Sequence, residues 1–127
     1  MTSAQGLLTQ ADRILAGDTS LPKGQATRVA AWLIRAALEL SVSDLLRGTI
    51  DNPERATMRS RLAALVSISH PTATSAAAAW TTLSRAAHHG GFALAPSAAE
   101  IRHWHDVVTT LGVQTIQPGS AHPNAMQ

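Results

Sequence analysis

The sequence contains no cysteine. Disulfide bonds, thiolate metal sites and cysteine nucleophiles are therefore excluded, and nothing indicates adaptation to an oxidising compartment. The amino terminus lacks the basic start and apolar block of a signal peptide, and no stretch approaches the ~18 apolar residues that a membrane-spanning helix needs. We therefore expect a cytoplasmic protein that is not embedded in a membrane.

Tyrosine is also absent, and the aromatic residues are limited to one phenylalanine and three tryptophans. Alanine, with 24 copies, must then build much of the core together with leucine, valine and isoleucine. Alanine is the best helix former, whereas a β-sheet would need runs rich in β-branched and aromatic residues, and no such runs occur. The composition predicts an all-α protein.

Charged residues are scarce, at 14% of the chain, against 45% hydrophobic residues. Such a chain can bury enough apolar surface to fold, which excludes a wholly disordered protein. Its 127 residues suit a single domain. Nine of the ten basic residues are arginine and the formal net charge is only +2, so the high isoelectric point is a weak indication of a nucleic-acid partner.

Hydrophobic spacing typical of helices recurs along the whole chain. Gly17, Gly48 and Gly90 supply stop signals, and the tetrad 97–100 is a capping box in which serine and glutamate each satisfy an amide of the first turn. The predicted helices span about residues 2–16, 24–47, 53–68, 72–89 and 97–111. We expect residues 1–112 to form one up-and-down antiparallel bundle of four to five helices, followed by a flexible tail at 113–127.

The apolar stripes of these helices indicate which side chains meet in the interior. We expect Trp32, Leu62, Trp80 and Trp104 to face the core as the main residues of their apolar stripes. Val66 is expected on the inner face of the third helix. The second helix is apolar over much more than one narrow stripe. It should therefore be the central helix, contacted on two sides.

Three arginines of the third predicted helix are candidates for binding phosphate groups. Arg55 and Arg59 are expected one turn apart on its outer side with Arg61 nearby, and Arg28 or Arg35 of a neighbouring helix could join them. The alternative is a solvated helix face without a ligand. Because all three tryptophans fit core stripes, the sequence lacks the aromatic platform typical of proteins that bind single-stranded nucleic acids.

The candidate catalytic residues are Arg85, His88 and His89, at the end of the fourth predicted helix. Arginine can hold a phosphate through two hydrogen bonds, and histidine can move a proton near neutral pH, so the group suits metal-free cleavage of RNA through its 2′-hydroxyl. The alternative is a solvent-facing helix end, where the backbone dipole favours positive charge.

No metal or cofactor site is predicted. His103 and His105 are two residues apart, so a helix directs their rings in nearly opposite directions, whereas two ligands of one metal are typically four residues apart on a helix. No glycine-rich loop has the spacing that cradles a phosphate. We therefore expect no cofactor.

Two segments resemble the HEPN group of small helical bundles: Ala31-Trp-Leu-Ile-Arg-Ala-Ala-Leu-Glu39, and Trp80-Thr-Thr-Leu-Ser-Arg-Ala-Ala-His-His89 before a proline-led final helix. The similarity covers about residues 25–111. It implies a four-helix bundle, a homodimer, and a role in RNA cleavage beside a partner such as an antitoxin. The HEPN motif places four to six residues between its arginine and histidine, whereas two separate Arg85 from His88 and three separate it from His89.

Two functional hypotheses follow. In the first, Arg85 steadies the scissile phosphate of an RNA, and His89 or His88 acts as general acid or base. In the second, the chain is a non-catalytic dimerisation or protein-interaction module, because some HEPN domains lack the motif and serve in that way. The sequence leaves open whether the protein is an enzyme.

Overall fold

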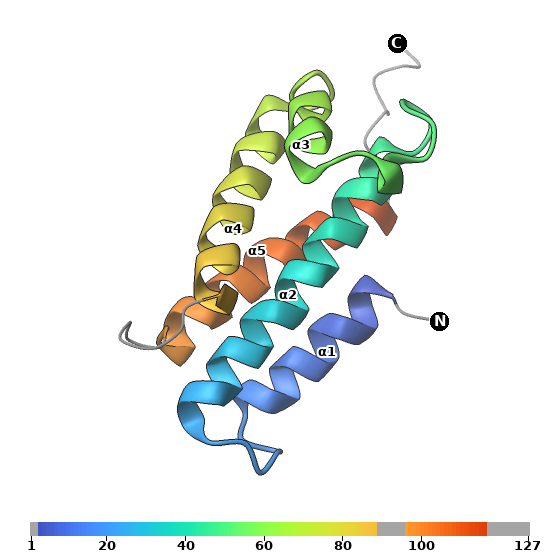
Figure 1. The fold of residues 1–127 in the computed structure, drawn as a ribbon. Helices are drawn as coiled ribbons and strands as arrows, with labels where there is room; N and C mark the ends of the chain where they lie inside the picture. The colour runs from blue at the N-terminus through green and yellow to red at the C-terminus, as the bar shows by residue number, and fades with distance from the viewer. Residues whose placement is uncertain (1–2, 89–95, 117–127) are drawn as a thin grey trace.

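The computed structural model describes residues 3–88 and 96–116, and within these ranges it contains helices and no strand (Figure 1). The elements are α1 (Ala4–Leu15), α2 (Lys23–Leu46), the 3-10 helix η1 (Pro53–Arg55), α3 (Met58–Val66), α4 (His70–His88) and α5 (Ala98–Ile116). The predicted fold class, an all-α bundle of four to five helices, is confirmed.

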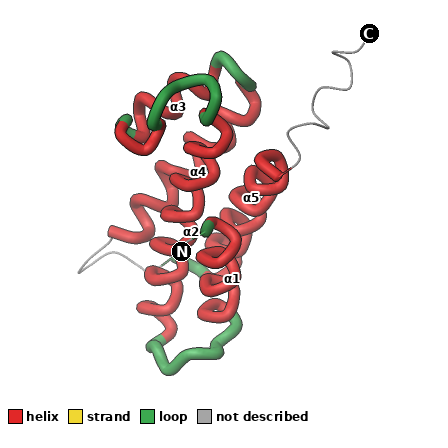
Figure 2. Tube along the Cα trace, turned by 90° about the vertical axis from the view of Figure 1, so that its right-hand side faces the viewer, coloured by secondary structure: helices red, strands yellow, loops and turns green. Residues whose placement is uncertain are grey.

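Helix α2 is the centre of the bundle. It contacts α1, α3, α4 and α5, and in Figure 1 it runs in front of α5 with α1 on one side and α4 on the other. Figure 2 shows that α3 lies at one end of the bundle and the loop between α1 and α2 at the other. The prediction that α2 is the central helix is therefore confirmed.

The buried face of α2 combines small and large side chains. Ala30, Ala31 and Ala37 are fully buried and let neighbouring helices approach closely, while Ile34 and Leu38 fill the space between them. The other helices add Leu65, Leu83, Ile101 and Val108 to the same core. This single core includes residues of α1, α2, α3, α4 and α5.

Several local signals act as the sequence predicted. Gly17 and Gly48 adopt positive φ values of 87° and 93° just after α1 and α2, a conformation that favours glycine. At α5 the capping box forms, because the Ser97 hydroxyl accepts from the Glu100 amide at 3.1 Å and the Glu100 carboxylate accepts from the Ser97 amide at 3.2 Å.

Three helix boundaries differ from the prediction. The chain from Asn52 forms only the 3-10 turn η1, because Asn52 is left-handed (φ 48°) and Ala56 is extended; Thr57 then caps α3, so that helix starts at Met58. Helix α4 already starts at His70, before the proline. Helix α5 continues past Gly112 to Ile116, whereas residues 117–127 of the predicted tail lie outside the described residues.

Two apolar residues predicted to face inward are exposed. Trp32 is 60% exposed and Val66 is 48% exposed, so both predictions are wrong. Trp32 lies on a solvent-facing side of α2, and Val66 is the last residue of α3. Trp80 and Trp104 are half-buried against the core, as is Leu62.

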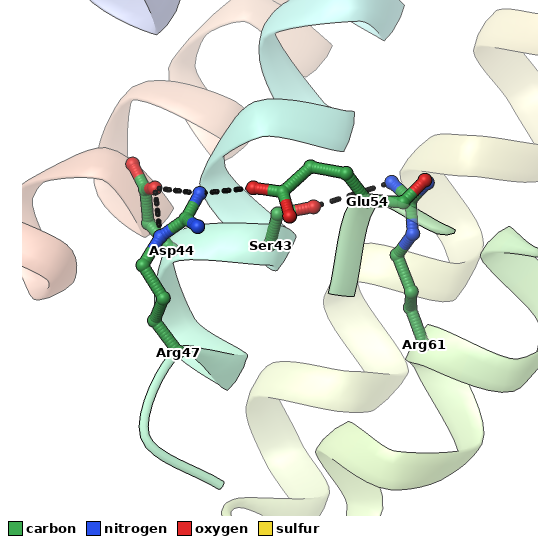
Figure 3. A network of polar contacts seen from close by, with 5 residues as sticks. All are labelled: Ser43, Asp44, Arg47, Glu54 and Arg61. Carbon is green, nitrogen blue, oxygen red and sulfur yellow. Dashed lines mark hydrogen bonds and ion pairs between the residues drawn. The ribbon is translucent and has the colours of Figure 1, made fainter. Parts of the chain in front are cut away.

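Arg61 is buried, which contradicts its prediction as a phosphate-binding residue beside Arg55 and Arg59. Its guanidinium donates to the backbone oxygens of Ala56 and Glu54, each at 3.0 Å, and to the Ser43 hydroxyl at 3.3 Å (Figure 3). The irregular chain before α3 presents carbonyl oxygens that only a donor can satisfy. Arg61 therefore fastens this segment to α2.

Arg47 and Glu54 make a second link at the same place, on the surface. The Arg47 guanidinium contacts Glu54 and lies 3.1 Å from Asp44 (Figure 3). The Glu54 carboxylate accepts a hydrogen bond from its own backbone and another from the side chain of Arg47. These two bonds, the backbone bond first, hold the pKa of the Glu54 carboxyl below its ordinary value of 4.5.

None of the helices in the described ranges is long and apolar enough to span a bilayer.

We expect Arg61→Ala to destabilise the fold by about 2–4 kcal/mol, because it leaves buried acceptors without a donor. Arg59→Ala is the matched control, since Arg59 is exposed on the same helix, and should change stability by less than about 0.5 kcal/mol. Urea unfolding followed by circular dichroism measures both. Equal stability of the two variants would contradict the structural role of Arg61.

The Glu54 link should depend on pH. The folded state lowers the pKa of Glu54, so the ionised carboxylate stabilises the fold at every pH above the ordinary pKa of this group. This contribution to stability is lost as the pH falls through the lowered pKa of the folded state. We expect the stability difference between the wild type and Glu54→Gln to narrow between about pH 6 and about pH 3 in urea unfolding. A difference that stays constant over this range would show that the link contributes nothing.

Candidate functional site

Arg35 joins the middle of α2 to the end of α4. Its guanidinium carbon lies 4.4 Å from the centre of the Trp80 ring, and its Nη1 lies 2.9 Å from Nε2 of His88. Trp80 and His88 are about two turns apart on α4. The Arg35 side chain lies between them and contacts both. We call Arg35, Trp80 and His88 the Arg35 cluster.

The helices place these groups for separate reasons. The face of α4 that carries Ala76 and Leu83 is buried in the core, and Trp80 lies at its margin with its body half-buried. The positive guanidinium is attracted by the negative face of the indole. His88 ends α4, where the unpaired carbonyls of the last turn favour positive charge nearby. A cation and an imidazole thus meet at the surface.

The contact with Arg35 fixes the hydrogen-bonding role of the His88 ring. A guanidinium only donates, so Nε2 of His88 must accept, and the proton of the neutral imidazole then belongs on Nδ1. In this form Nε2 carries a lone pair aimed at Arg35. The same lone pair could take a proton from a substrate if Arg35 moved to another acceptor.

Further buried polar atoms of α2 and α4 lack hydrogen-bond partners in the described ranges. The Nε atoms of Arg28 and Arg35 and the hydroxyl of Ser84 are buried and form no hydrogen bond within the described ranges. Arg28 lies two turns before Arg35 on α2, and Ser84 lies one turn from both Trp80 and His88 on α4. Buried polar atoms without a partner thus occur on both α2 and α4 in the described ranges.

The predicted catalytic residues are only partly brought together. Arg85 and His88 are both exposed and three residues apart on α4, so they are neighbours on its surface, but in the part of the chain that the structure describes no hydrogen bond joins them. His88 instead contacts Arg35, for which the sequence predicts only a phosphate contact. His89 lies outside the described residues.

The three predicted phosphate-binding arginines do not form one group. Arg55 belongs to η1 and Arg59 to α3, and both are exposed. Arg61 is only 9% exposed and its donors are occupied by Ala56, Glu54 and Ser43. A buried guanidinium whose donors are occupied in this way is not available to a phosphate from solution.

The remaining histidines of α5 have structural contacts. Nε2 of His105 lies 2.9 Å from the Leu8 backbone oxygen and links α5 to α1, while the His103 ring meets Trp104 edge-on at 4.7 Å between ring centres. Within residues 3–88 and 96–116, no three His, Asp or Glu side chains are grouped so that they could hold a metal ion.

Comparison of the chain with protein-family models, with curated proteins and with solved structures finds no match. The case for a function therefore depends on the residues of the chain and on their geometry. Within that geometry, the Arg35 cluster brings a guanidinium and an imidazole to hydrogen-bonding distance.

The Arg35 contact predicts the tautomer of His88. We expect neutral His88 in the wild type to carry its proton on Nδ1, and Arg35→Ala to release this constraint so that both tautomers are populated. Nitrogen chemical shifts of the imidazole in two-dimensional NMR distinguish the two forms. An Nε2-protonated ring in the wild-type protein would contradict the contact.

Proposed function

We propose that this chain is a HEPN-like protein that binds RNA and cleaves it without a metal ion, with His88 as the proton-transfer group and Arg35 as the phosphate-binding group. The observation that carries the proposal is the 2.9 Å contact between Arg35 and His88 at the protein surface. A guanidinium and an imidazole in contact supply the two functions that RNA cleavage through the 2′-hydroxyl needs.

The resemblance to HEPN bundles supports the same site. The two segments that carry the resemblance lie in α2 and α4, and they contribute Arg35 from one and Trp80 and His88 from the other. The short spacing between Arg85 and His88 departs from the HEPN motif. Arg35 compensates for this departure, because it brings a second arginine to the same imidazole from a different helix.

The reaction would begin with phosphate binding. A phosphate group entering between α2 and α4 attracts the guanidinium of Arg35, with Arg28 and Arg85 as further cations beside it. When Arg35 turns from His88 to the phosphate, Nε2 of His88 loses its donor. Substrate binding therefore frees the proton acceptor at the place where the substrate lies.

The chemical step then needs two proton transfers. Nε2 of His88 takes the proton of the 2′-hydroxyl, the 2′-oxygen attacks phosphorus, and the bond from phosphorus to the 5′-oxygen breaks. The 5′-oxygen leaves with a proton from a second acid, for which His89 is the candidate from the sequence. The products are a 2′,3′-cyclic phosphate and a 5′-hydroxyl end. Arg35 stabilises the charge that develops on the phosphate oxygens.

A second candidate function is that of a non-catalytic dimerisation module. The observation in its favour is Trp32, a large apolar side chain that is 60% exposed on the uncovered side of α2. An exposed tryptophan is typical of protein interfaces, where it often contributes much of the binding energy. This candidate requires no activity of His88.

We expect His88→Ala and Arg35→Ala each to lower the rate of RNA cleavage by about 10²- to 10⁴-fold in the presence of a chelator. His103→Ala and Arg102→Ala are matched controls, because both residues are exposed on α5, and they should leave the rate unchanged. Gel analysis of a labelled single-stranded RNA measures the rates, and circular dichroism verifies the fold.

The products and the substrate sugar give an independent check. Replacing the RNA by DNA of the same sequence should abolish cleavage, and the RNA products should end in cyclic phosphates. Cleavage that survives both His88→Ala and Arg35→Ala, or that requires a divalent cation, would refute the proposed function. A wild-type protein that cleaves no RNA would leave the dimerisation module as the better account.

A further inference from the structure

We propose that a pocket between α1, α2 and η1 binds a small organic cation, an amine with an apolar body, whose ammonium group pairs with Glu39. The pocket has a volume of about 320 Å³ and shares no residue with the Arg35 cluster. The proposal goes beyond RNA cleavage and does not depend on it. We call this pocket the Glu39 pocket.

Apolar side chains form much of the Glu39 pocket. Leu7 of α1 and Ala36 and Leu40 of α2 line it, and all three are only half-buried, so apolar surface stays in contact with water there. A ligand with an apolar body would remove that surface from water, which favours binding. The volume is at the lower end of the range for pockets that hold small molecules. It therefore suits a single ring or a short alkyl chain.

Glu39 gives the pocket a negative charge that has no counter-ion. Its side chain is half-buried, and it makes no ion pair with any residue that the structure describes. Arg35 lies one turn earlier on α2, at a spacing that allows an ion pair with Glu39, but its guanidinium contacts Trp80 and His88 instead. A partly desolvated carboxylate without a cation favours a ligand that supplies one.

The other charges at the pocket balance one another. Glu54 is contacted by Arg47, which also lies 3.1 Å from Asp44. The Arg61 guanidinium is held by hydrogen bonds to the surrounding chain, as Figure 3 shows for its contact with a serine of α2. These two arginines balance Glu54 and Asp44, so the charge of Glu39 remains. A cation is therefore the favoured ligand, whereas Glu39 would repel a carboxylate or a phosphate.

The pocket also offers the acceptors that an ammonium group needs. A primary ammonium carries three N–H donors and no acceptor. Glu39 and Glu54 both line the pocket with carboxylate oxygens, and Ser43 adds a hydroxyl. An amine with an apolar body thus finds charge, hydrogen-bond acceptors and apolar contacts in one place.

A second pocket with carboxylates, between α1 and α5, lacks this combination. There Arg102 lies 3.6 Å from Asp12, and His105 lies 3.9 Å from Asp106. Both carboxylates are also largely exposed, so water solvates them. The half-buried carboxylate without a basic neighbour distinguishes the Glu39 pocket.

The first experiment measures the binding of 2-phenylethylamine, which is protonated at neutral pH, through amide shifts in two-dimensional NMR. We expect saturable shifts at Ala36, Glu39 and Leu40, with a dissociation constant of roughly 0.1–10 mM for so small a ligand. The neutral 2-phenylethanol and the anionic 3-phenylpropanoate carry the same ring. They should bind at least about tenfold more weakly, because neither pairs with the carboxylate.

The second experiment removes the charge of the pocket. Glu39→Gln keeps the size of the side chain and should weaken the binding of 2-phenylethylamine by about tenfold or more, while the binding of 2-phenylethanol stays unchanged. Asp18→Asn is the matched control, because Asp18 is exposed on the loop between α1 and α2 and the net charge changes equally. It should bind the amine like the wild type.

The third experiment fills the apolar part of the pocket. Ala36→Leu places a larger side chain where the apolar body of the ligand would lie, and it should abolish saturable binding. Ala78→Leu is the matched control, since Ala78 is exposed on α4, and circular dichroism verifies that both variants are folded. His88→Ala should bind the amine like the wild type, which separates this proposal from RNA cleavage.

Three outcomes would overturn the proposal. A wild-type spectrum that does not change with 2-phenylethylamine shows that the pocket holds no such ligand. Equal binding of the amine and the alcohol, or of the amine to the wild type and to Glu39→Gln, shows that Glu39 does not select the ligand. A blocked lysine that binds more tightly than 2-phenylethylamine assigns the pocket to a side chain of a partner protein instead.

Discussion

The close packing of α2 against its neighbours is the constraint on which the other features of this protein depend. Fully buried alanines such as Ala30, Ala31 and Ala37 let α1, α4 and α5 approach the helix on three sides. Larger side chains at these positions would push the neighbours apart. Most of the α2 surface is therefore buried against these three helices, and a narrow side between α1 and α4 remains open to solvent. The candidate chemistry and the candidate interface both lie along that side.

The sequence predicted the features that depend on local chemistry. The capping box at Ser97 and the glycine conformations after α1 and α2 involve residues a few positions apart, so their pattern is readable without the fold. Two errors have a different origin. Trp32 fits an apolar stripe, but a helix with apolar residues on most sides does not reveal which side stays open. Arg61 fits a polar stripe, but the long side chain turns back to satisfy carbonyls of a loop whose shape depends on the left-handed Asn52.

The candidate site could be predicted only in part for the same reason. The chemistry of Arg85 and His88 is visible in the sequence because they share one turn of a helix. The contact between Arg35 and His88 joins residues 53 positions apart, and it depends on how α2 and α4 are aligned along their length. No local pattern fixes that alignment, which results from the packing of the whole core. The arginine beside the imidazole therefore became apparent only in the fold.

The most direct test of this account is the environment of the Arg35 side chain in solution, measured by proton NMR. With its guanidinium carbon 4.4 Å from the Trp80 ring centre, Arg35 should show upfield-shifted side-chain protons and nuclear Overhauser contacts to the rings of both Trp80 and His88. Arg35 protons at ordinary shifts, without contacts to either ring, would contradict the alignment of α2 with α4 and the site that depends on it.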